Sequence, residues 1–392
     1  MSGETKIEKQ SRKTKNPKRK KSFAGKITII VLVAIVVIAA AIFLISAFTE
    51  FTGYEVISTL DIPNADANIK VEKYKSGYVK CAGDGLTYFD RNNIYWTETY
   101  TMAQPLCDVS GDYVAVCDVK STEVFLYNAS GYLNTISVPN AITDVEVSKL
   151  GTIAVATKDG NTNYILVYDS DGNELINAKT VFSSSGYPVD ISLSSDGERL
   201  AAAFVGTKGT SINSKVVFYD FSKNADSGED LITGTFDDFK GTLLTTVEFV
   251  NDSKVVACGD NAIVVYDAEG TPSVANEMRD FSYQIQSLFL DSGHVGMVVE
   301  NKDGEDAYCV KVYNLDLKTV LDQPFDYAYN KVGFAGDSVY IYSDYDVDIY
   351  NYFGTHKLSE TFDTKIINLA SCGDGSAFIY MTSQDTQFIQ MK

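Results

Sequence analysis

The chain has 392 residues, of which 45% are hydrophobic, 12% aromatic and 22% charged, and these proportions exclude a collagen-like, low-complexity or disordered chain. The net charge of −19 is unevenly distributed, because residues 1–26 carry +8 and the remainder carries −27. Such a chain is an ordered protein with a sizeable core and a basic N-terminal tail. Its composition does not identify an activity.

The first predicted element is a membrane-spanning helix at residues 27–48. This stretch of 22 residues has no charged side chain, and as a helix it would extend about 33 Å, enough for a hydrocarbon core of about 30 Å. Lysines and arginines cluster before it, whereas no basic residue follows it until Lys70. The positive-inside rule then predicts a basic cytoplasmic tail at 1–26 and an extracytoplasmic domain at 49–392.

Two other interpretations of the N-terminal region are open. Residues 45–47, Ile-Ser-Ala, resemble a signal-peptide cleavage site, but the apolar run exceeds the roughly 7 to 15 residues of a signal peptide. The basic tail could contact nucleic acid, but the acidic remainder of the chain would repel phosphates. We therefore expect a single-pass protein of the cell membrane, with the lipid bilayer as a partner of residues 27–48 and no nucleic-acid partner.

Beyond residue 50, a repeated pattern of short strands and tight turns predicts an all-β domain. Runs of Val, Ile, Tyr, Phe and Thr alternate with polar residues and are interrupted by Gly, Asp, Asn or Ser. One recurring sequence motif, called the first phrase below, ends a strand with Tyr followed by Asp or Asn and a turn, as in LVYDSDG at 166–172. A second phrase precedes it and places a Gly or Ser seven positions after a polar residue, as from Asp190 to Gly197. Together the two phrases predict a four-stranded meander.

The spacing of the tyrosines in the first phrase predicts a β-propeller. A period of about 45 residues with four strands per repeat is typical of propeller blades, and the domain has room for about 7.7 such repeats. Eight blades are the best count, and seven are the alternative. The tyrosines are Tyr127, Tyr168, Tyr219, Tyr266, Tyr313 and Tyr350, separated by 41, 51, 47, 47 and 37 residues.

The two ends of the domain predict how the ring closes. Residues 54–62, YEVISTLDI, form a lone strand before the first repeat, whereas the final repeat, residues 366–391, contains only three strands. We expect the lone strand to form the outer edge of the last blade. This arrangement would pair both ends of the domain and protect their edges.

The Tyr-Asp phrases resemble the blades of WD40-like and quinoprotein-like propellers, although the Trp-Asp dipeptide of WD repeats is absent and Trp96 is the only tryptophan. With the basic tail and the single membrane helix, the whole chain resembles a family of membrane-anchored propeller proteins of unknown function from Gram-positive bacteria. This resemblance implies the architecture and carries no catalytic residues.

Candidate ligand-binding residues are the first polar residues of the second phrase. The innermost strand of each blade lines the channel of a propeller, so these side chains would form a mixed polar ring near its mouth. The ring could orient a small ligand or simply solvate a water-filled channel. Its members are Lys70, Asp144, Asp190, Thr246, Lys331 and Asn368.

Acidic clusters and histidines offer little for catalysis or metal binding. Residues 169–174, DSDGNE, are similar to the start of a calcium loop, but the register is incomplete and a hairpin turn explains them. The alternating carboxylates at 344–348 would share one strand face, which water can solvate. Only two histidines exist, and no hydrolase or nucleotide motif occurs. We expect no catalytic residue, no metal and no cofactor.

Two further features concern the cysteines and an insertion. Four of the six cysteines, Cys81, Cys117, Cys258 and Cys309, lie in apolar strand runs, which predicts buried free thiols. Cys107 and Cys117 lie in neighbouring strands and are the first pair to test for a disulfide.

Residues 221–241 form the largest insertion, and we expect them to be an exposed loop.

Three functions are compatible with this sequence. The leading hypothesis is a non-catalytic platform that binds or scaffolds a protein or a cell-envelope component. The alternative is a propeller enzyme of the lyase, glycosidase or quinoprotein-like kind with its site at the central channel. Signal transfer across the membrane is a third hypothesis, but a tail of 26 residues is too short for a folded cytoplasmic domain.

Overall fold

The computed structural model describes residues 22–65, 68–181, 186–222, 231–281, 285–301, 304 and 306–392. It divides into two units, residues 1–49 and 50–392. The first unit contains one helix, α1 (Ser22–Phe48), which includes the predicted segment 27–48; of the predicted basic tail, residues 1–21 lie outside the described residues. Over the part of the chain that is described, no helix combines the length and apolarity needed to cross a membrane.

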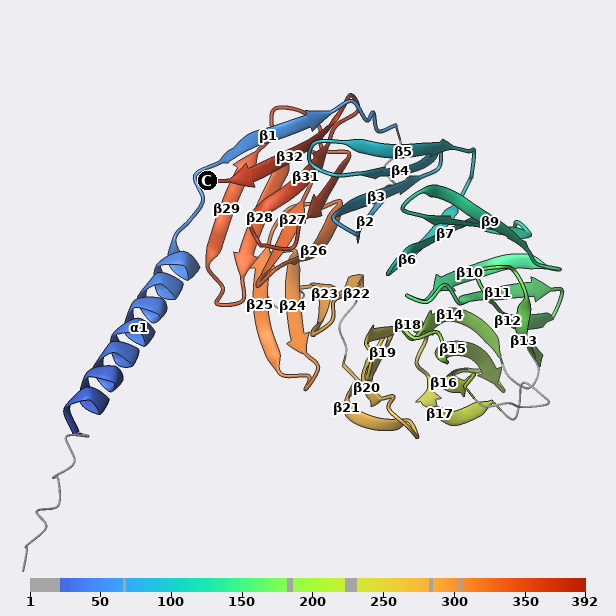
Figure 1. Cartoon of the computed structure of the whole chain (residues 1–392). Helices are drawn as coiled ribbons and strands as arrows, with labels where there is room; N and C mark the ends of the chain where they lie inside the picture. Colours follow the sequence, from blue (N-terminus) through green and yellow to red (C-terminus); the bar gives the residue numbers. More distant parts are fainter. Residues whose placement is uncertain are drawn as a thin grey trace, which may run out of the picture. The chain divides into compact units, whose positions relative to one another are not determined.

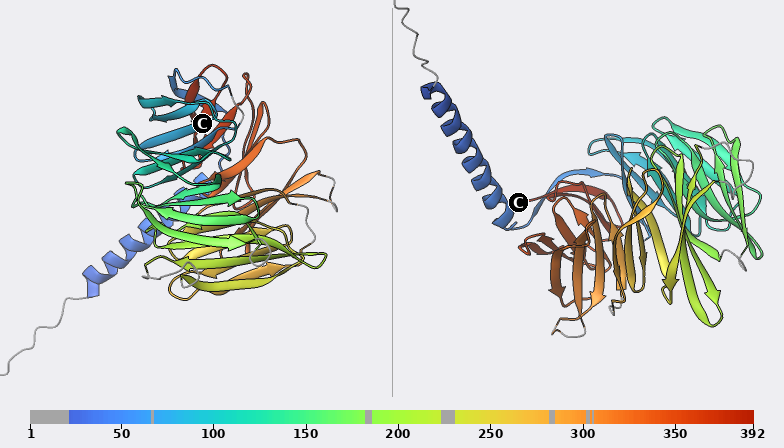
Figure 2. Two further views of the ribbon diagram at one scale, coloured as in Figure 1. Left: turned by 90° about the vertical axis from the view of Figure 1, so that its right-hand side faces the viewer. Right: turned by 90° about the horizontal axis from the view of Figure 1, so that it is seen from below.

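The second unit is an eight-bladed β-propeller, as the repeat spacing predicts (Figure 1). Each blade is a four-stranded antiparallel sheet, and its first strand lies nearest the channel, where it contacts the first strand of a neighbouring blade. Two further views show the same sheets from the side and from below (Figure 2). The expected all-β domain with eight blades rather than seven is therefore confirmed.

The first four blades follow the chain order without crossovers. Blade 1 contains β2 (Lys70–Tyr74), β3 (Gly77–Ala82), β4 (Gly85–Phe89) and β5 (Ile94–Thr99), and blade 2 contains β6 (Pro105–Ser110), β7 (Tyr113–Asp118), β8 (Glu123–Asn128) and β9 (Gly131–Ser137). Blade 3 contains β10 (Ala141–Val147), β11 (Ile153–Asp159), β12 (Thr162–Tyr168) and β13 (Glu174–Val181), and blade 4 contains β14 (Tyr187–Leu193), β15 (Arg199–Lys208), β16 (Ser211–Asp220) and β17 (Ile232–Lys240).

The next three blades repeat this arrangement, and the eighth differs. Blade 5 contains β18 (Leu244–Asn251), β19 (Lys254–Gly259), β20 (Ala262–Asp267) and β21 (Ser273–Arg279), and blade 6 contains β22 (Ile285–Leu290), β23 (His294–Glu300), β24 (Tyr308–Asn314) and β25 (Thr319–Phe325). Blade 7 contains β26 (Lys331–Ala335), β27 (Ser338–Tyr342), β28 (Asp346–Asn351) and β29 (His356–Thr361), and blade 8 contains β30 (Asn368–Ser371), β31 (Ala377–Met381), β32 (Thr386–Met391) and β1 (Tyr54–Leu60).

Blade 8 closes the ring in the predicted way, because its outer strand comes from the start of the domain. Strand β1 pairs antiparallel with β32, with Tyr54 opposite Met391 and Leu60 opposite Thr386. Beyond the ladder, the amide of Lys392 donates to the carbonyl of Gly53 at 2.9 Å. The two ends of the domain therefore protect each other as strand partners.

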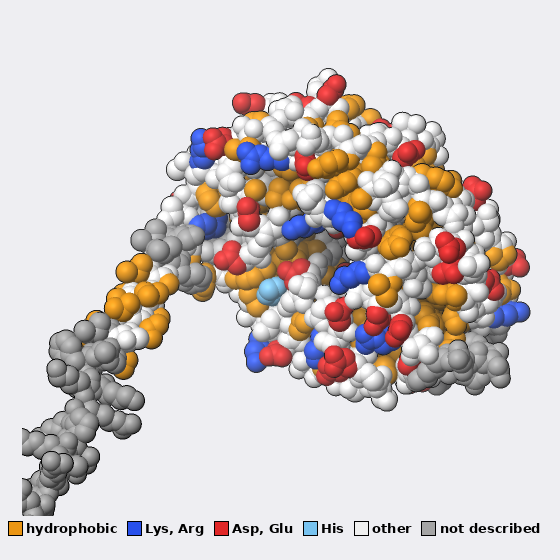
Figure 3. All heavy atoms as spheres, viewed as in Figure 1, with side chains coloured by type: hydrophobic (Ala, Val, Ile, Leu, Met, Phe, Trp, Pro, Cys, Tyr) orange, Lys and Arg blue, Asp and Glu red, His pale blue; other side chains and the backbone are white. Residues whose placement is uncertain are grey.

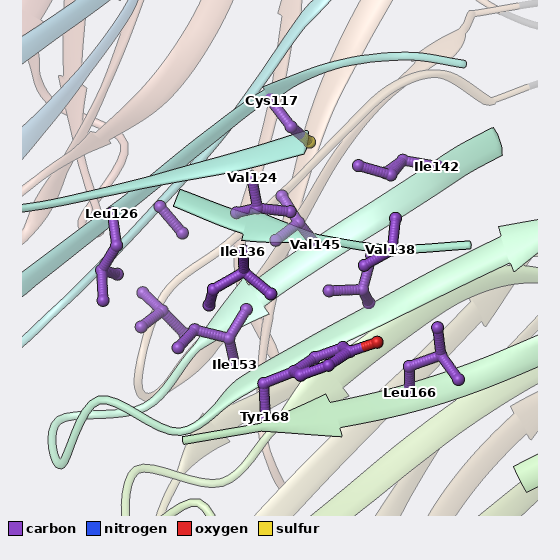
Figure 4. Packing of buried hydrophobic residues seen from close by; sticks show 13 residues of the cluster. Cys117, Val124, Leu126, Ile136, Val138, Ile142, Val145, Ile153, Leu166 and Tyr168 are labelled. Atoms are coloured by element: carbon purple, nitrogen blue, oxygen red, sulfur yellow. The ribbon is translucent and has the colours of Figure 1, made fainter. Parts of the chain in front are cut away.

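The hydrophobic core is divided among the boundaries between blades. Eight clusters of buried side chains each draw on two neighbouring sheets, and together they link every blade to the next, including blade 8 to blade 1. Figure 4 shows the cluster between blades 2 and 3, in which Leu126, Ile153 and Tyr168 pack together. The six phrase tyrosines are all buried in such boundaries. Their repetition therefore reflects packing.

The prediction of an exposed loop at residues 221–241 is wrong for the second half of this segment. Residues 223–230 lie outside the described residues, but Ile232–Lys240 forms β17, the outer strand of blade 4. Phe239 on this strand is fully buried against blade 5. The sequence did not predict this strand because its acidic side chains are typical of a loop. A half-buried edge strand needs apolar residues only at alternate positions.

A buried asparagine secures the closing segment to blade 8. Asn64 follows β1, and its Nδ2 donates to the carbonyls of Thr382 at 2.9 Å and Asp385 at 3.0 Å. The hydroxyl of Thr386 donates in return to the carbonyl of Ile62 at 3.1 Å. These bonds satisfy backbone groups that water cannot reach.

We predict that Asn64→Ala lowers the free energy of unfolding by about 1–3 kcal/mol, since it leaves buried carbonyls without donors. Urea unfolding of the full chain in detergent micelles measures the change. The matched control is Asn177→Ala, which removes an exposed bond to Glu174 and should change stability by less than about 0.5 kcal/mol. Equal stability of the two variants would show that the Asn64 contacts do not hold the ring closed.

Candidate functional site

The candidate site is a cavity of about 360 Å³ at the channel, lined by the inner strands of blades 1 to 5 and the turns that follow them. Basic and acidic side chains gather around the hollow in the middle of the propeller (Figure 3). The cavity lies within the size range of small-ligand sites. Its charged lining residues are Lys70, Asp108, Glu146, Lys149, Asp190, Glu248 and Asp252.

Several of these side chains bridge one blade to the next. The carboxylate of Asp108 accepts from the amide of Val147 at 2.7 Å, so that blade 2 is tied to blade 3. Asp144 ties blade 3 to blade 4 through the amide of Ile191 at 3.1 Å. The inner strand of a blade has one edge without a strand partner, and these side chains satisfy backbone groups on that edge.

The same bridging continues on both sides of this pair. Asp190 accepts from the amide of Val247 at 2.7 Å and ties blade 4 to blade 5. Lys70 donates to the carbonyl of Cys107 at 2.9 Å and ties blade 1 to blade 2. Asn368 donates to the carbonyl of Ile69 and ties blade 8 to blade 1. Five successive boundaries are therefore bridged by side chains of the inner strands.

The six predicted channel residues separate into three pairs. Lys70 and Asp190 line the cavity, and Asp144 and Asn368 bridge blades beside it. Thr246 and Lys331 are not among the described residues that line this cavity. Lys331 nevertheless lies close enough to Glu72 and Lys70 for their charges to act on it, and burial lowers its pKa.

The carboxyl groups at the site are held in their protonated forms to higher pH than usual. Burial raises the pKa of Asp190 to about 8 and that of Asp144 to about 6, and these two side chains are hydrogen-bonded to each other. Burial also raises the pKa of Glu146 well above its ordinary value, and the nearby charges of Asp108 and Asp144 raise it further. Like charges in a poorly hydrated site account for all three shifts.

Lys70 is the main counter-ion of this cluster. Its side chain is 49% accessible, but it lines the cavity, where protein groups surround the ammonium. Burial alone would lower the pKa of Lys70, but the carboxylates of Glu72 and Asp108 raise it above its usual range. The ammonium therefore stays charged throughout the physiological pH range.

Four acidic residues of the site were not among the predicted ones, and one of them, Asp252, lies in the turn after β18. Glu146 and Glu248 lie two positions after Asp144 and Thr246, and alternate residues of a strand share one face. That spacing was a usable signal. Asp108 was missed because the polar phrase of blade 2 lacks the seven-residue spacing found in the other repeats.

The two acidic clusters and the candidate disulfide pair each have a place in the structure. The Asp169 carboxylate accepts from the amides of Asp171 and Asn173, which makes the loop a hairpin turn. The 344–348 carboxylates pair with neighbouring side chains, and no metal-binding group occurs among the described residues. All six cysteines are free, as expected for the buried ones. Cys117 lies opposite Leu106, one position from the Val116–Cys107 pair, and so faces away from Cys107.

We predict that Asp190→Asn flattens the pH dependence of stability. An Asp whose pKa rises from about 3.9 in the unfolded chain to about 8 in the folded one stabilises the fold below pH 4 and loses that contribution as pH rises to 8. Thermal unfolding between pH 4 and 8 measures the slope. Asp171→Asn, at an exposed turn residue, serves as the control and should keep the parental slope. An unchanged slope in Asp190→Asn would contradict the assignment.

Comparison with solved structures shows the fold of the propeller. BamB from Moraxella catarrhalis is 12% identical, with 86% of this chain and 100% of that chain covered and a TM-score of 0.53. Sqt1 from Chaetomium thermophilum is also 12% identical, with the same coverage and a TM-score of 0.55. At this level of identity the likeness concerns the fold alone. No curated protein matches the chain in sequence.

The family comparison covers nearly the whole propeller. A family model described as a family of unknown function, DUF5711, matches residues 47–391. The matched segment begins at the end of α1 and includes every strand of the eight blades. The chain therefore belongs to the DUF5711 family.

Proposed function

We propose that this chain is a membrane-anchored, extracytoplasmic propeller that binds a cationic group of a protein or cell-envelope partner in its channel cavity and catalyses no reaction. The proposal rests on one observation, the excess of carboxyl groups in the cavity. Five acidic residues and two lysines line it. A bound ammonium or guanidinium group would compensate that excess.

Glu146 and Glu248 are the groups most available to a ligand. Among the described residues, neither carboxylate has a hydrogen-bond or ion-pair partner, although the charge of Lys70 acts on both. Burial raises the pKa of Glu248 as it does that of Glu146. A carboxylate in such surroundings gains more from a cation than one in water does, because the local dielectric constant is lower.

The geometry favours binding over catalysis. Asp108, Asp144 and Asp190 each accept a backbone amide of the next blade, so moving one of them would disturb a blade boundary. No histidine or arginine occurs among the described residues that line the cavity. A lyase, glycosidase or quinoprotein-like site would need an acid–base pair free to reach a substrate, and most of these carboxylates are already engaged.

The membrane anchor is supported by the sequence of α1. Residues 27–48 have no charged side chain, and the basic cluster lies only on their N-terminal side. Large apolar side chains from Ile29 to Ile38 are at least half accessible in the part of the chain that the structure describes. A lipid bilayer would bury these side chains and leave the propeller outside the cell.

We predict that the chain stays in the membrane fraction after alkaline carbonate extraction. In intact protoplasts, a C-terminal tag should react with an added antibody, whereas an N-terminal tag should react only after permeabilisation. Loss of the N-terminal tag would support the cleaved-signal alternative. Release by carbonate, or two tags on the same side, would contradict the anchor.

We predict that tri-lysine, acetylated and amidated at its ends, binds the full chain in detergent micelles and that tri-glutamate does not. Glu146→Gln should weaken tri-lysine binding about tenfold, the usual loss of one charge-assisted bond. Affinity should rise from pH 5.5 to 8, because Asp144 and Asp190 lose protons with pKa values of about 6 and 8 and a cation favours the ionised form. Isothermal titration calorimetry measures both effects.

The control for this experiment is Glu123→Gln, at an exposed position on β8. It should bind tri-lysine as the parent chain does. Equal weakening in Glu123→Gln and Glu146→Gln would mean that the peptide binds the acidic surface in general. Absence of binding at low ionic strength, where charge interactions are least screened, would contradict the cation site.

A further inference from the structure

Two cysteines meet at the boundary between blades 1 and 2. Cys81 lies on β3 and Cys107 on β6, and both belong to the cluster that joins these blades. The two thiols lie close enough for a side-chain hydrogen bond between them to shift the pKa of each, and the Cys81 sulfur lies 3.4 Å from the hydroxyl of Tyr100. The pair therefore lies across a blade boundary, with one thiol on each side.

Lys70 places a positive charge beside this pair. It lies directly opposite Cys81 in the β2–β3 ladder, and its ammonium donates to the carbonyl of Cys107 at 2.9 Å. The hydrogen bond from Cys107 lowers the pKa of Cys81, and Tyr100 and Lys70 lower it further. The same hydrogen bond, together with burial, raises the pKa of Cys107 well above its ordinary value, so the proton of the pair stays on Cys107. Cysteines become reactive in such electropositive surroundings.

Among the described residues, none of the other cysteines is hydrogen-bonded to a second cysteine. Burial raises the pKa of Cys258 and Cys117, and Cys309 donates to the carboxylate of Asp322 at 2.8 Å, which also raises its pKa. These thiols behave as small apolar side chains in the core. Burial also raises the pKa of the half-buried Cys372, although Lys73 acts on it as Lys311 acts on Cys309. Mutual contact is therefore what distinguishes Cys81 and Cys107.

We propose that Cys81 and Cys107 form a dithiol site that exchanges with a small disulfide and closes into a disulfide between blades 1 and 2. Cys107 is half-buried and Cys81 is 2% exposed, so exchange starts at Cys107. This site is independent of the cation binding proposed above. It is a modification site in its own right.

The exchange is balanced in two steps. The Cys107 sulfur attacks one sulfur of a disulfide RSSR while its proton passes to the Cys81 thiolate. A mixed disulfide forms and RS⁻ leaves, and RS⁻ then takes that proton from Cys81. The Cys81 thiolate then attacks the Cys107 sulfur and releases the second RS⁻, which takes up the proton that Cys81 lost on ionising. Two protein thiols are oxidised, and one small disulfide is reduced to two thiols.

The charge of the cavity selects the class of disulfide. Cys107 precedes Asp108, a lining residue, and its carbonyl is bound by Lys70, another lining residue. A cationic disulfide such as cystamine is attracted by the surrounding carboxylates, whereas glutathione disulfide is anionic. This preference rests on the proposed cation site, but formation of the Cys81–Cys107 bond does not.

The test uses the full chain in detergent micelles, reduced, freed of reductant and incubated with cystamine at pH 8. Remaining thiols are alkylated under denaturing conditions, and digested peptides are analysed by mass spectrometry. We expect the free thiols to fall from six to four, with one peptide pair joined through Cys81 and Cys107. Cystamine should react about tenfold faster than glutathione disulfide at low ionic strength.

Substitutions separate the two steps. Cys81→Ala should retain one cysteamine group on Cys107, because the resolving thiol is missing, and Cys107→Ala should form neither adduct nor bridge. Cys258→Ala, at a buried thiol elsewhere, should react as the parent chain does. Circular dichroism checks folding, and the peptide map of the unsubstituted chain decides the question even if a variant unfolds.

Two outcomes overturn the proposal. Alkylation of both Cys81 and Cys107 after cystamine treatment would show that the pair does not exchange, and a bridge between any other cysteines would show that the contact does not direct it. The bridge could also form at equal rates with cystamine and glutathione disulfide. That result would support the dithiol site and contradict only the cation site.

Discussion

Unpaired strand edges are the constraint on which this structure depends. Each four-stranded blade has an outer edge facing solvent and an inner edge facing the channel, and backbone groups on the inner edge have little access to bulk water. The chain meets this constraint in two ways. Its first strand, β1, covers the outer edge of β32, and polar side chains on the inner strands bond to the backbone of the next blade. The apolar clusters between blades then complete a closed ring.

This solution has an electrostatic consequence for the channel. A carboxylate that accepts a backbone amide must stay near the channel, so a run of three such bridges, Asp108, Asp144 and Asp190, concentrates negative charge in one sector. Burial raises the pKa values of Asp144 and Asp190, and neighbouring carboxylates raise them further. The same carboxylates therefore bond to the backbone of the next blade and give the channel its charge.

Local patterns explain which parts of this fold the sequence could predict. Strand alternation, turn glycines and buried tyrosines repeat along the chain, so the blade number and the closing strand follow from spacing. Strand β17 was not predicted, because its exposed acidic side chains are typical of a loop. Phe239, on the same strand, is buried. The channel lining was predicted only in part, since it depends on which inner-strand residues meet across blades. Asp108 and Glu146 come from different repeats and have no common spacing.

Position within the strand separates the carboxylates that bridge blades from one that has no hydrogen-bond partner among the described residues. Asp144 and Asp190, at the start of the phrase, are bonded to backbone amides and hold blades together. Glu146, two residues later on the same strand, lines the cavity without a hydrogen-bond partner among the described residues. A side chain with no structural task and an unfavourable electrostatic position costs stability, and proteins tolerate such a cost mainly at functional sites. Glu146 is therefore the residue from which a function of this channel is best argued.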